Sequence, residues 1–249
     1  MQDSLNSTEI SRYLTPEFPG SIIIKQKTAS TNTDAKELAL QNACPYTTVI
    51  ADTQTAGRGR GEERTFYSPQ DTGIYLSILL PYTAENLLKI TPAIGVAVCQ
   101  TIESFTDVKP EIKWVNDILM QGRKVCGILC ESIPNTSMAV AGIGINFSTA
   151  EFPTALDGIA GPVFVDPPVT RNEFIGTLLN RILGLKYDQC ISEYRKRSCV
   201  IGKSIRYLEK NIWHTAVATD IDENGCLGII EDNVRKTLVS GEITLRITE

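Results

Sequence analysis

Histidine is nearly absent: the 249 residues contain only His214. One imidazole cannot supply the paired histidines of most zinc sites, and it disfavours a Ser-His-Asp triad. His214 follows Trp213 in a segment of short β-type runs, so we interpret it as structural. An excess of positive charge is also missing, because 24 Lys and Arg against 29 Asp and Glu leave a net charge of −5. This balance disfavours a general nucleic-acid binder and restricts cationic function to a local patch.

Long apolar runs are missing as well. None approaches the roughly 18 apolar residues that a membrane helix needs, and the polar N-terminal segment lacks the apolar core of a signal peptide. We therefore predict a soluble, cytoplasmic protein that does not act at a membrane. The cysteines are odd in number, form no C-x-x-C pair, and are interpreted as small buried residues rather than a zinc or disulfide framework. They are Cys44, Cys99, Cys126, Cys130, Cys190, Cys199 and Cys226.

Apolar residues make up 42% of the chain, which is enough to build a core. Their runs predict strands at residues 21–27, 47–51, 73–80, 112–115, 125–130 and 138–147. Helical periodicity and capping signals predict helices from Thr31 with Asp34 as capping-box partner, from Thr91 to about residue 105, from Thr170 with Glu173, and at 192–197. These elements predict an α+β body.

The sequence changes in texture after Cys199. Short β-type segments at 204–208, 214–221, 227–230 and 243–247 are separated by turn signals such as Asn224-Gly225. They predict a small β-barrel or sandwich appended to the body. We place the boundary near Val200, which gives domains 1–199 and 200–249.

The most unusual segment lies at residues 51–69, where Gly57, Gly59 and Gly61 alternate with Arg58 and Arg60. Glycine lets the backbone approach a ligand closely, and each guanidinium offers a fork of donors suited to phosphate or carboxylate oxygens. We call residues 57–66 the Gly–Arg loop. An arginine-rich turn or a minor-groove hook is the alternative, but one hook in an acidic protein is weak support for DNA binding. The loop favours a small anionic ligand.

A second segment, residues 113–131, predicts a hairpin with a tight turn at 121–122. Asn116 and Asp117 end one strand, and Lys124 opens the next, three residues before Gly127. Such a hairpin can point one cation inward and place a carboxylate near the same cleft. A surface hairpin with solvated charges explains the pattern equally well, so this segment alone does not decide.

Two glycines, Gly142 and Gly144, interrupt an apolar strand that leads to Asn146. Glycine weakens a strand interior unless something must approach its backbone closely. The segment is not a dinucleotide fingerprint, because a third glycine and a following helix are missing. The Gly-Lys-Ser at 202–204 is not a P-loop end, because Arg197 stands where the first glycine should be.

Together and in this order, these segments resemble the biotin–protein ligase family, also called biotin–[acetyl-CoA-carboxylase] ligases. The matching motifs are S-T-N at 30–32, Q-T-A-G-R-G-R at 54–60, S-P at 68–69, K-W-V-N-D at 113–117, G-R-K-V-C-G-I-L at 122–129 and G-I-G-I-N at 142–146. The likeness covers nearly the whole chain from Ser21 onward. It implies a mixed-sheet catalytic domain flanked by helices, the biotin/lipoate ligase fold, plus a C-terminal SH3-like β-barrel.

The resemblance implies a ligase that uses ATP to form biotinyl-5′-AMP and then transfers biotin to a lysine of a biotin carboxyl carrier domain, of acetyl-CoA carboxylase or pyruvate carboxylase. Mg²⁺ would accompany ATP, and we assign it no protein ligands. The implied catalytic residues are Lys124, Arg58, Arg60 and Asp117. The implied biotin-binding residues are Ser30, Thr31, Asn32, Gln54, Gly57, Arg58, Gly59, Arg60, Lys124, Gly127, Gly142 and Gly144. The implied ATP-binding residues are Arg58, Arg60, Phe66, Asn116, Lys124 and Asn146.

Roles follow from the same resemblance. Ser30, Thr31 and Gln54 would hydrogen-bond the ureido head of biotin, and the bicyclic body would lie against the glycine strand. Lys124 would bridge the biotin carboxylate and the α-phosphate, and the Gly–Arg loop would exclude water from the anhydride. Asp117 has three open roles: orienting Lys124, supporting the metal, or accepting a proton from the acceptor lysine.

The chain departs from the family pattern in two places. The Gly–Arg loop is one residue longer, with Glu62 and Glu63 adding negative charge and Phe66 standing roughly where an adenine-stacking tryptophan is expected. Val115 replaces a proline, which should matter little within a strand.

The sequence also bears on DNA binding, on oligomeric state and on two alternative functions. The segment before Ser21 is too short for the DNA-binding domain of some members, so we expect no operator binding; a homodimer or a monomer is left open. A lipoate–protein ligase-like acyl transferase is the nearest alternative function. A non-catalytic adaptor whose loop docks an acidic partner is the other, but it leaves Lys124 and Asp117 unexplained.

Overall fold

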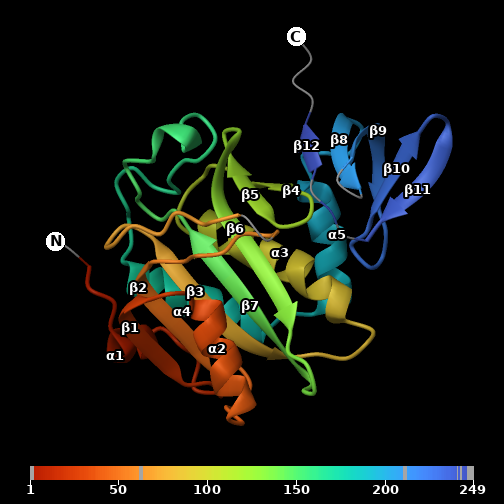
Figure 1. The fold of residues 1–249 in the computed structure, drawn as a ribbon. Helices are drawn as coiled ribbons and strands as arrows, with labels where there is room; N and C mark the ends of the chain where they lie inside the picture. The colour runs from red at the N-terminus through yellow and green to blue at the C-terminus, as the bar shows by residue number, and fades with distance from the viewer. Residues whose placement is uncertain (1–2, 62–63, 210–211, 240, 242, 246–249) are drawn as a thin grey trace.

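The computed structural model describes residues 3–61, 64–209, 212–239, 241 and 243–245. Their centre is a seven-stranded sheet in the order β1-β2-β3-β7-β6-β5-β4 (Figure 1). Only β1 and β2 pair in parallel, so the mixed sheet predicted from the sequence is confirmed. Its strands are β1 (Ile22–Thr28), β2 (Thr48–Gln54), β3 (Ile74–Pro81), β4 (Glu111–Lys113), β5 (Asp117–Met120), β6 (Arg123–Ser132) and β7 (Met138–Ile145).

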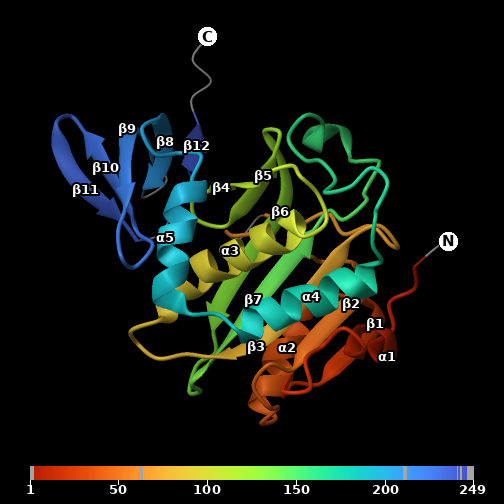
Figure 2. The ribbon, with the colours of Figure 1, turned by 180° about the vertical axis from the view of Figure 1, so that it is seen from behind.

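Helices cover both faces of this sheet. Helix α2 packs on β2, β3 and β7, whereas α3 and α4 lie on the opposite face, as seen from behind in Figure 2. Strand β3 and helix α3 are apolar almost throughout and are almost wholly buried where the two pack into the core. The helical elements are α1 (Ser7–Ser11), α2 (Thr31–Leu40), η1 (Leu87–Lys89), α3 (Ile90–Glu103), η2 (Thr154–Leu156), α4 (Arg171–Leu183) and α5 (Tyr187–Arg197).

A second, antiparallel sheet follows α5, in the order β11-β10-β9-β8-β12. It is joined to the body by the Trp114 indole, whose Nε1 donates to the Gly225 carbonyl at 2.9 Å. Strands β11 and β12 are its two edges among the described residues, so the closed SH3-like barrel expected above is not confirmed. Its strands are β8 (Ser204–Glu209), β9 (Ile212–Ile221), β10 (Leu227–Glu231), β11 (Val234–Leu238) and β12 (Ile243–Leu245).

Local differences from the sequence prediction have physical causes. Ser30, not Thr31, is the N-cap of α2: the Ser30 backbone is extended, whereas Thr31 is the first helical residue and its hydroxyl bonds to Gln54. Helix α3 begins one residue before Thr91, where the 3₁₀ turn η1 leads directly into it. Val115 lies outside β4, and the Trp114–Val115 peptide bond is cis, a conformation found mainly before proline. The expected placement of Val115 within a strand was therefore wrong.

Other predictions are confirmed or fall outside the described residues. The Thr170 hydroxyl accepts from the Glu173 amide and caps α4 as predicted. All seven cysteines are free thiols, but only four are buried: Cys130 and Cys190 are half-buried and Cys44 is exposed. No helix of the described part of the chain is long and apolar enough to cross a membrane. Glu62, Glu63 and residues 246–247 of the last predicted strand lie outside the described residues.

Candidate functional site

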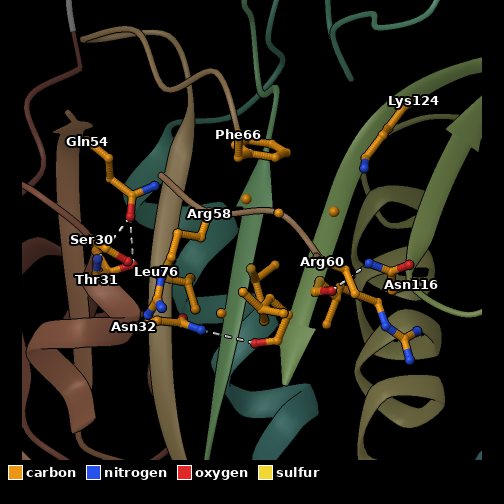
Figure 3. A pocket seen from close by; sticks show the side chains of 17 residues that line it. Ser30, Thr31, Asn32, Gln54, Arg58, Arg60, Phe66, Leu76, Asn116 and Lys124 are labelled. Atoms are coloured by element: carbon orange, nitrogen blue, oxygen red, sulfur yellow. Dashed lines mark hydrogen bonds between the residues drawn. The ribbon is translucent and has the colours of Figure 1, made fainter. Parts of the chain in front are cut away.

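A pocket lies where the Gly–Arg loop crosses the sheet, between the start of α2 and the β6–β7 pair (Figure 3). The loop is itself a short hairpin: the Gly59 amide donates to the Arg64 carbonyl at 2.7 Å, and the Phe66 amide donates to the Gly57 carbonyl at 2.9 Å. Because this hairpin lies across the start of α2 and strands β6 and β7, residues far apart in the sequence line one cavity. Its lining consists of Ser30, Thr31, Asn32, Gln54, Arg58, Gly59, Arg60, Phe66, Leu76, Asn116, Lys124, Gly127, Ile128, Leu129, Gly142, Ile143 and Gly144.

One end of the pocket is polar. The Gln54 side-chain oxygen accepts from the Thr31 amide at 2.9 Å and lies 3.2 Å from the Thr31 hydroxyl, while its amide nitrogen donates to the Ser68 hydroxyl at 3.1 Å. Ser30 caps α2 by its backbone alone, since its side chain makes no capping bond. These groups form a rigid set of donors and acceptors that can recognise a small polar head group.

Behind this end lies a buried polar network centred on Asn32. The Ser77 hydroxyl donates to the Asn32 side-chain oxygen at 2.6 Å, and the Asn32 amide donates to Glu131 at 2.8 Å. Burial alone would raise the pKa of Glu131, but hydrogen bonds from Lys36 and Asn32 outweigh it and hold that pKa below its usual range. Glu131 therefore stays ionised and fixes the orientation of the Asn32 amide.

The two strand glycines make room for side chains of the chain itself. A Cβ on Gly142 would lie 2.1 Å from the Asn32 side-chain oxygen, and a Cβ on Gly144 would lie 2.6 Å from the Phe66 ring. Because Phe66 rests on this strand, the cavity volume is only about 50 Å³, against roughly 300–1,000 Å³ for typical ligand sites. The Phe66 ring therefore occupies space against the glycine strand that a ligand could otherwise use.

The other end of the pocket carries the cations. The Lys124 ammonium lies 2.6 Å from an Asp117 carboxylate oxygen on the neighbouring strand. The β5–β6 register shifts after Ile118, so that Val125 is an extra, bulged residue. The bulge brings Lys124 to the same face as Gly127, where a Cβ on the glycine would meet the lysine Cε at 3.1 Å.

The two arginines of the loop differ in their surroundings. Arg58 donates to the Thr33 hydroxyl at 3.3 Å and lies 3.8 Å from Glu131. Burial lowers the pKa of the Arg60 guanidinium below its ordinary value. Arg60 is therefore a desolvated cation for which an anionic ligand would be a favourable partner.

Three predicted site residues do not line the pocket. Gly57 is a loop-hairpin residue beside Gln54 and Ser68. The Asn146 side-chain amide donates to the carbonyls of Lys124 and Gly161, at 3.1 and 3.3 Å, and so holds the backbone of Lys124. Asp117 reaches the pocket only through Lys124.

Four lining residues, Leu76, Ile128, Leu129 and Ile143, were not among the predicted site residues, and neither was Ser77 behind the pocket. Leu76 lines it directly, and Ser77 supports Asn32 from behind. Both sit in an apolar run that reads simply as a buried strand. Its one hydroxyl-bearing residue was the available signal, because a buried serine must find a partner.

The site thus joins a polar end, a middle floored by glycines and an end that carries Lys124, an arrangement suited to a small molecule with a polar group at one end and an anionic group at the other. Residues 24–148, about half of the chain, match the model of the Biotin/lipoate A/B protein ligase family. The chain belongs to this family.

Individual relatives agree with this assignment. The Biotin--[acetyl-CoA-carboxylase] ligase of Mycobacterium tuberculosis is 32% identical over 228 residues, which cover 82% of this chain and 81% of that protein. The Bifunctional ligase/repressor BirA of Bacillus spizizenii is 38% identical over 164 residues, 63% of this chain and 50% of that protein. The chain spans about half the length of the Bacillus relatives it matches. The biotin protein ligase from Aquifex aeolicus in complex with biotin and ATP has a TM-score of 0.78 at 27% identity, covering 90% of this chain and 98% of its own.

Proposed function

We propose that the protein activates biotin with ATP as biotinyl-5′-AMP and transfers biotin to a lysine of a biotin carboxyl carrier domain. The observation that carries this proposal is the arrangement of one pocket: Gln54 and Thr31 lie at one end and Lys124 at the other, and Arg58, beside Glu131, and Arg60 also line it (Figure 3). Biotin has the matching polarity, with a ureido head, an apolar body and a carboxylate tail. Relatives named as biotin ligases support the assignment.

The polar end is proposed to bind the ureido group. Ser30 has a hydroxyl not engaged in capping, and Gln54 and Thr31 are already oriented by each other. Buried polar atoms of a ligand need such partners, since leaving one unsatisfied costs about 1–3 kcal/mol. The bicyclic body is proposed to lie toward Gly142 and Gly144, once the Phe66 ring has shifted.

The cationic end is proposed to overcome the repulsion between two anions. A carboxylate and a phosphate oxygen about 4 Å apart repel by roughly 4 kcal/mol at an effective dielectric constant of about 20. Lys124 would bridge the two, and Arg58 and Arg60 would hold phosphate oxygens, so that charge is stabilised as the new bond forms. Asn116 and Phe66 are proposed to contact the nucleotide side.

The second half-reaction requires that the anhydride survive until the acceptor arrives. The Gly–Arg loop already crosses the pocket as a hairpin, which suits it to exclude water from the intermediate. The neutral amine of the acceptor lysine then attacks the acyl carbon, and AMP leaves. We propose that Asp117 acts in this cycle by holding Lys124.

Further proposals rest on the family resemblance. Mg²⁺ would arrive with the nucleotide phosphates, which needs no protein cage. The described residues contain no cluster of three or more His, Cys, Asp or Glu that could hold a metal.

The five-stranded sheet would be the SH3-like domain, with its boundary near Val200. We further propose a cytoplasmic protein, whose oligomeric state sedimentation would measure.

The experiment is biotin-dependent exchange of pyrophosphate into ATP, run beside the same assay with lipoate. We expect exchange with biotin, little with lipoate, and biotinyl-5′-AMP among the products. Exchange with lipoate alone would favour the lipoate-ligase alternative. No exchange with either acid would reject the enzyme and favour an adaptor.

A further inference from the structure

A buried arginine, Arg171, lies outside the pocket. It contacts residues on both sides of the Gly–Arg loop, the segment that crosses the pocket. Arg171 is the first residue of α4, and its side chain is 2% exposed. Its guanidinium lies 2.7 Å from an Asp52 oxygen and 3.9 Å from Asp71, and donates to the Gly73 carbonyl at 3.2 Å. It also donates to the carbonyl of Asp3 near the N-terminus.

Asp52 and Asp71 flank the Gly–Arg loop on its two sides. Asp52 comes two residues before Gln54, and its carboxylate accepts from the Asp71 amide at 3.3 Å. A second hydrogen bond links the same two segments: the Thr53 hydroxyl donates to the Ser68 carbonyl at 2.8 Å. The two roots of the loop are thus held to each other and, through one guanidinium, to α4.

This anchoring has a direct consequence for the ligand-binding groups. Gln54 and Ser68, which bond to each other, lie between the two anchored aspartates. A buried guanidinium must keep its charged partners, because an unpaired charge in the interior is strongly unfavourable. Arg171 therefore restricts where Asp52 can stand, and with it the direction in which the Gln54 side chain points.

We propose that Arg171 is a positioning residue for ligand binding: through Asp52 it fixes the root of the Gly–Arg loop, and it acts without touching the ligand. The proposal rests on biotin being the ligand, as proposed above. Asp3 supplies a matched comparison, because it is a second carboxylate partner of the same guanidinium but belongs to the N-terminal segment. The contacts with Asp52 and Asp71 lead to the loop, whereas the contact with Asp3 does not.

The test compares Asp52→Asn with Asp3→Asn in the full chain. Asparagine keeps an acceptor for the Asp71 amide but removes the charge that Arg171 pairs with. Biotin dissociation constants are measured by calorimetry, and amide hydrogen exchange of residues 53–68 is measured without ligand. Thermal unfolding of both variants reports any general loss of stability.

We expect Asp52→Asn to weaken biotin binding about tenfold or more, because small misplacements of positioned groups are costly, and to speed exchange in residues 53–68. Asp3→Asn should stay within about twofold in binding, with loop exchange unchanged. Equal effects of the two variants on binding and exchange, or no effect of Asp52→Asn on either, would overturn the proposal. If the wild-type protein does not bind biotin, the proposed function fails, whereas the exchange comparison still decides whether Arg171 anchors the loop.

Discussion

The Lys124 ammonium and the Asp117 carboxylate form a 2.6 Å ion pair beside the pocket, with side chains 32% and 21% exposed. An ion pair so accessible to water contributes little to stability, typically about 0–1 kcal/mol. It does set the position of the ammonium over Gly127, because the carboxylate sits on the neighbouring strand. The pair is therefore better explained by a role at the site than by folding.

Replacing Lys124 by alanine should abolish adenylate formation while leaving the fold intact. The change removes the charge proposed to bridge carboxylate and phosphate, but only a weak contribution to stability. Pyrophosphate exchange and thermal unfolding are the measurements. Arg123→Ala, at the exposed cation next in the chain, is the control and should retain activity. Near wild-type biotinylation by Lys124→Ala would show that the assignment is wrong.

Asp117→Asn separates the roles left open for this carboxylate. If Asp117 positions Lys124, adenylate formation slows and biotin affinity changes little, because the carboxylate does not line the pocket. If it instead accepts the proton of the acceptor lysine, the first half-reaction is normal and only transfer slows. We expect the first pattern. Single-turnover rates with biotin and ATP, and separately with preformed biotinyl-5′-AMP and carrier, measure the two steps.

The position of Lys124 shows where sequence reasoning reaches its limit. Its identity came from a motif, yet three residues along a regular strand it and Gly127 would face opposite sides. The Val125 bulge reverses this, and nothing in the run from 123 to 130 marks it. Asn146 is the converse case, because its motif suggested a ligand contact while its amide bonds to backbone carbonyls.

The fold could be predicted from the sequence more completely than the side-chain contacts within it. Long apolar runs such as residues 73–80 determine strands by composition, and turn residues determine where they end. The missed strand β11 (Val234–Leu238) has three polar residues in a row, and four of its five residues are exposed. A strand without a buried face leaves no alternation to read. The ring of Phe66 lies on the glycine strand, and its expected position beside adenine stays a prediction.

Acid should weaken the C-terminal sheet through Glu231. Hydrogen bonds from Lys236, Tyr207 and His214 lower the pKa of Glu231 from 4.5 to about 2. A carboxyl with a lowered pKa in the folded state stabilises that state above its unfolded pKa, and the contribution is lost as pH falls from about 4.5 towards 2. Glu231→Gln should therefore have a lower Tm than wild type at pH 7, with the gap closing at acid pH. A gap that stays constant down to pH 2 would contradict this assignment.

Gly142→Ala should destabilise the protein. Its Cβ would lie 2.1 Å from the Asn32 side-chain oxygen. That oxygen accepts from Ser77 and the Asn32 amide nitrogen donates to Glu131, so the side chain cannot move without breaking hydrogen bonds. Such overpacking costs about 1–3 kcal/mol. Gly95→Ala is the control, since its Cβ would make ordinary contacts of 3.6 Å or more inside α3 and should be neutral or stabilising. Urea unfolding of both variants tests the difference; equal stabilities would count against the rigidity of Asn32.

Gly144 and Phe66 should be coupled in stability but not in ligand binding. A Cβ on Gly144 would come within 2.6 Å of the Phe66 ring, so Gly144→Ala forces the ring to move. In a Phe66→Ala background that clash is gone, and the same alanine should then cost little. We expect an interaction free energy of about 1 kcal/mol or more from the double-mutant cycle, within the range for residues in contact.

Biotin affinity should behave differently in the same four proteins. If the bicyclic body packs toward Gly144 after the ring shifts, an alanine there obstructs the ligand whether or not Phe66 is present. Gly144→Ala should then weaken binding in both backgrounds, while Phe66→Ala alone opens a cavity that is nearly filled by its ring. Calorimetric titration measures all four affinities. Full recovery of binding in the double variant would mean that Gly144 serves only to accommodate Phe66, and that the bicyclic body lies elsewhere in the pocket.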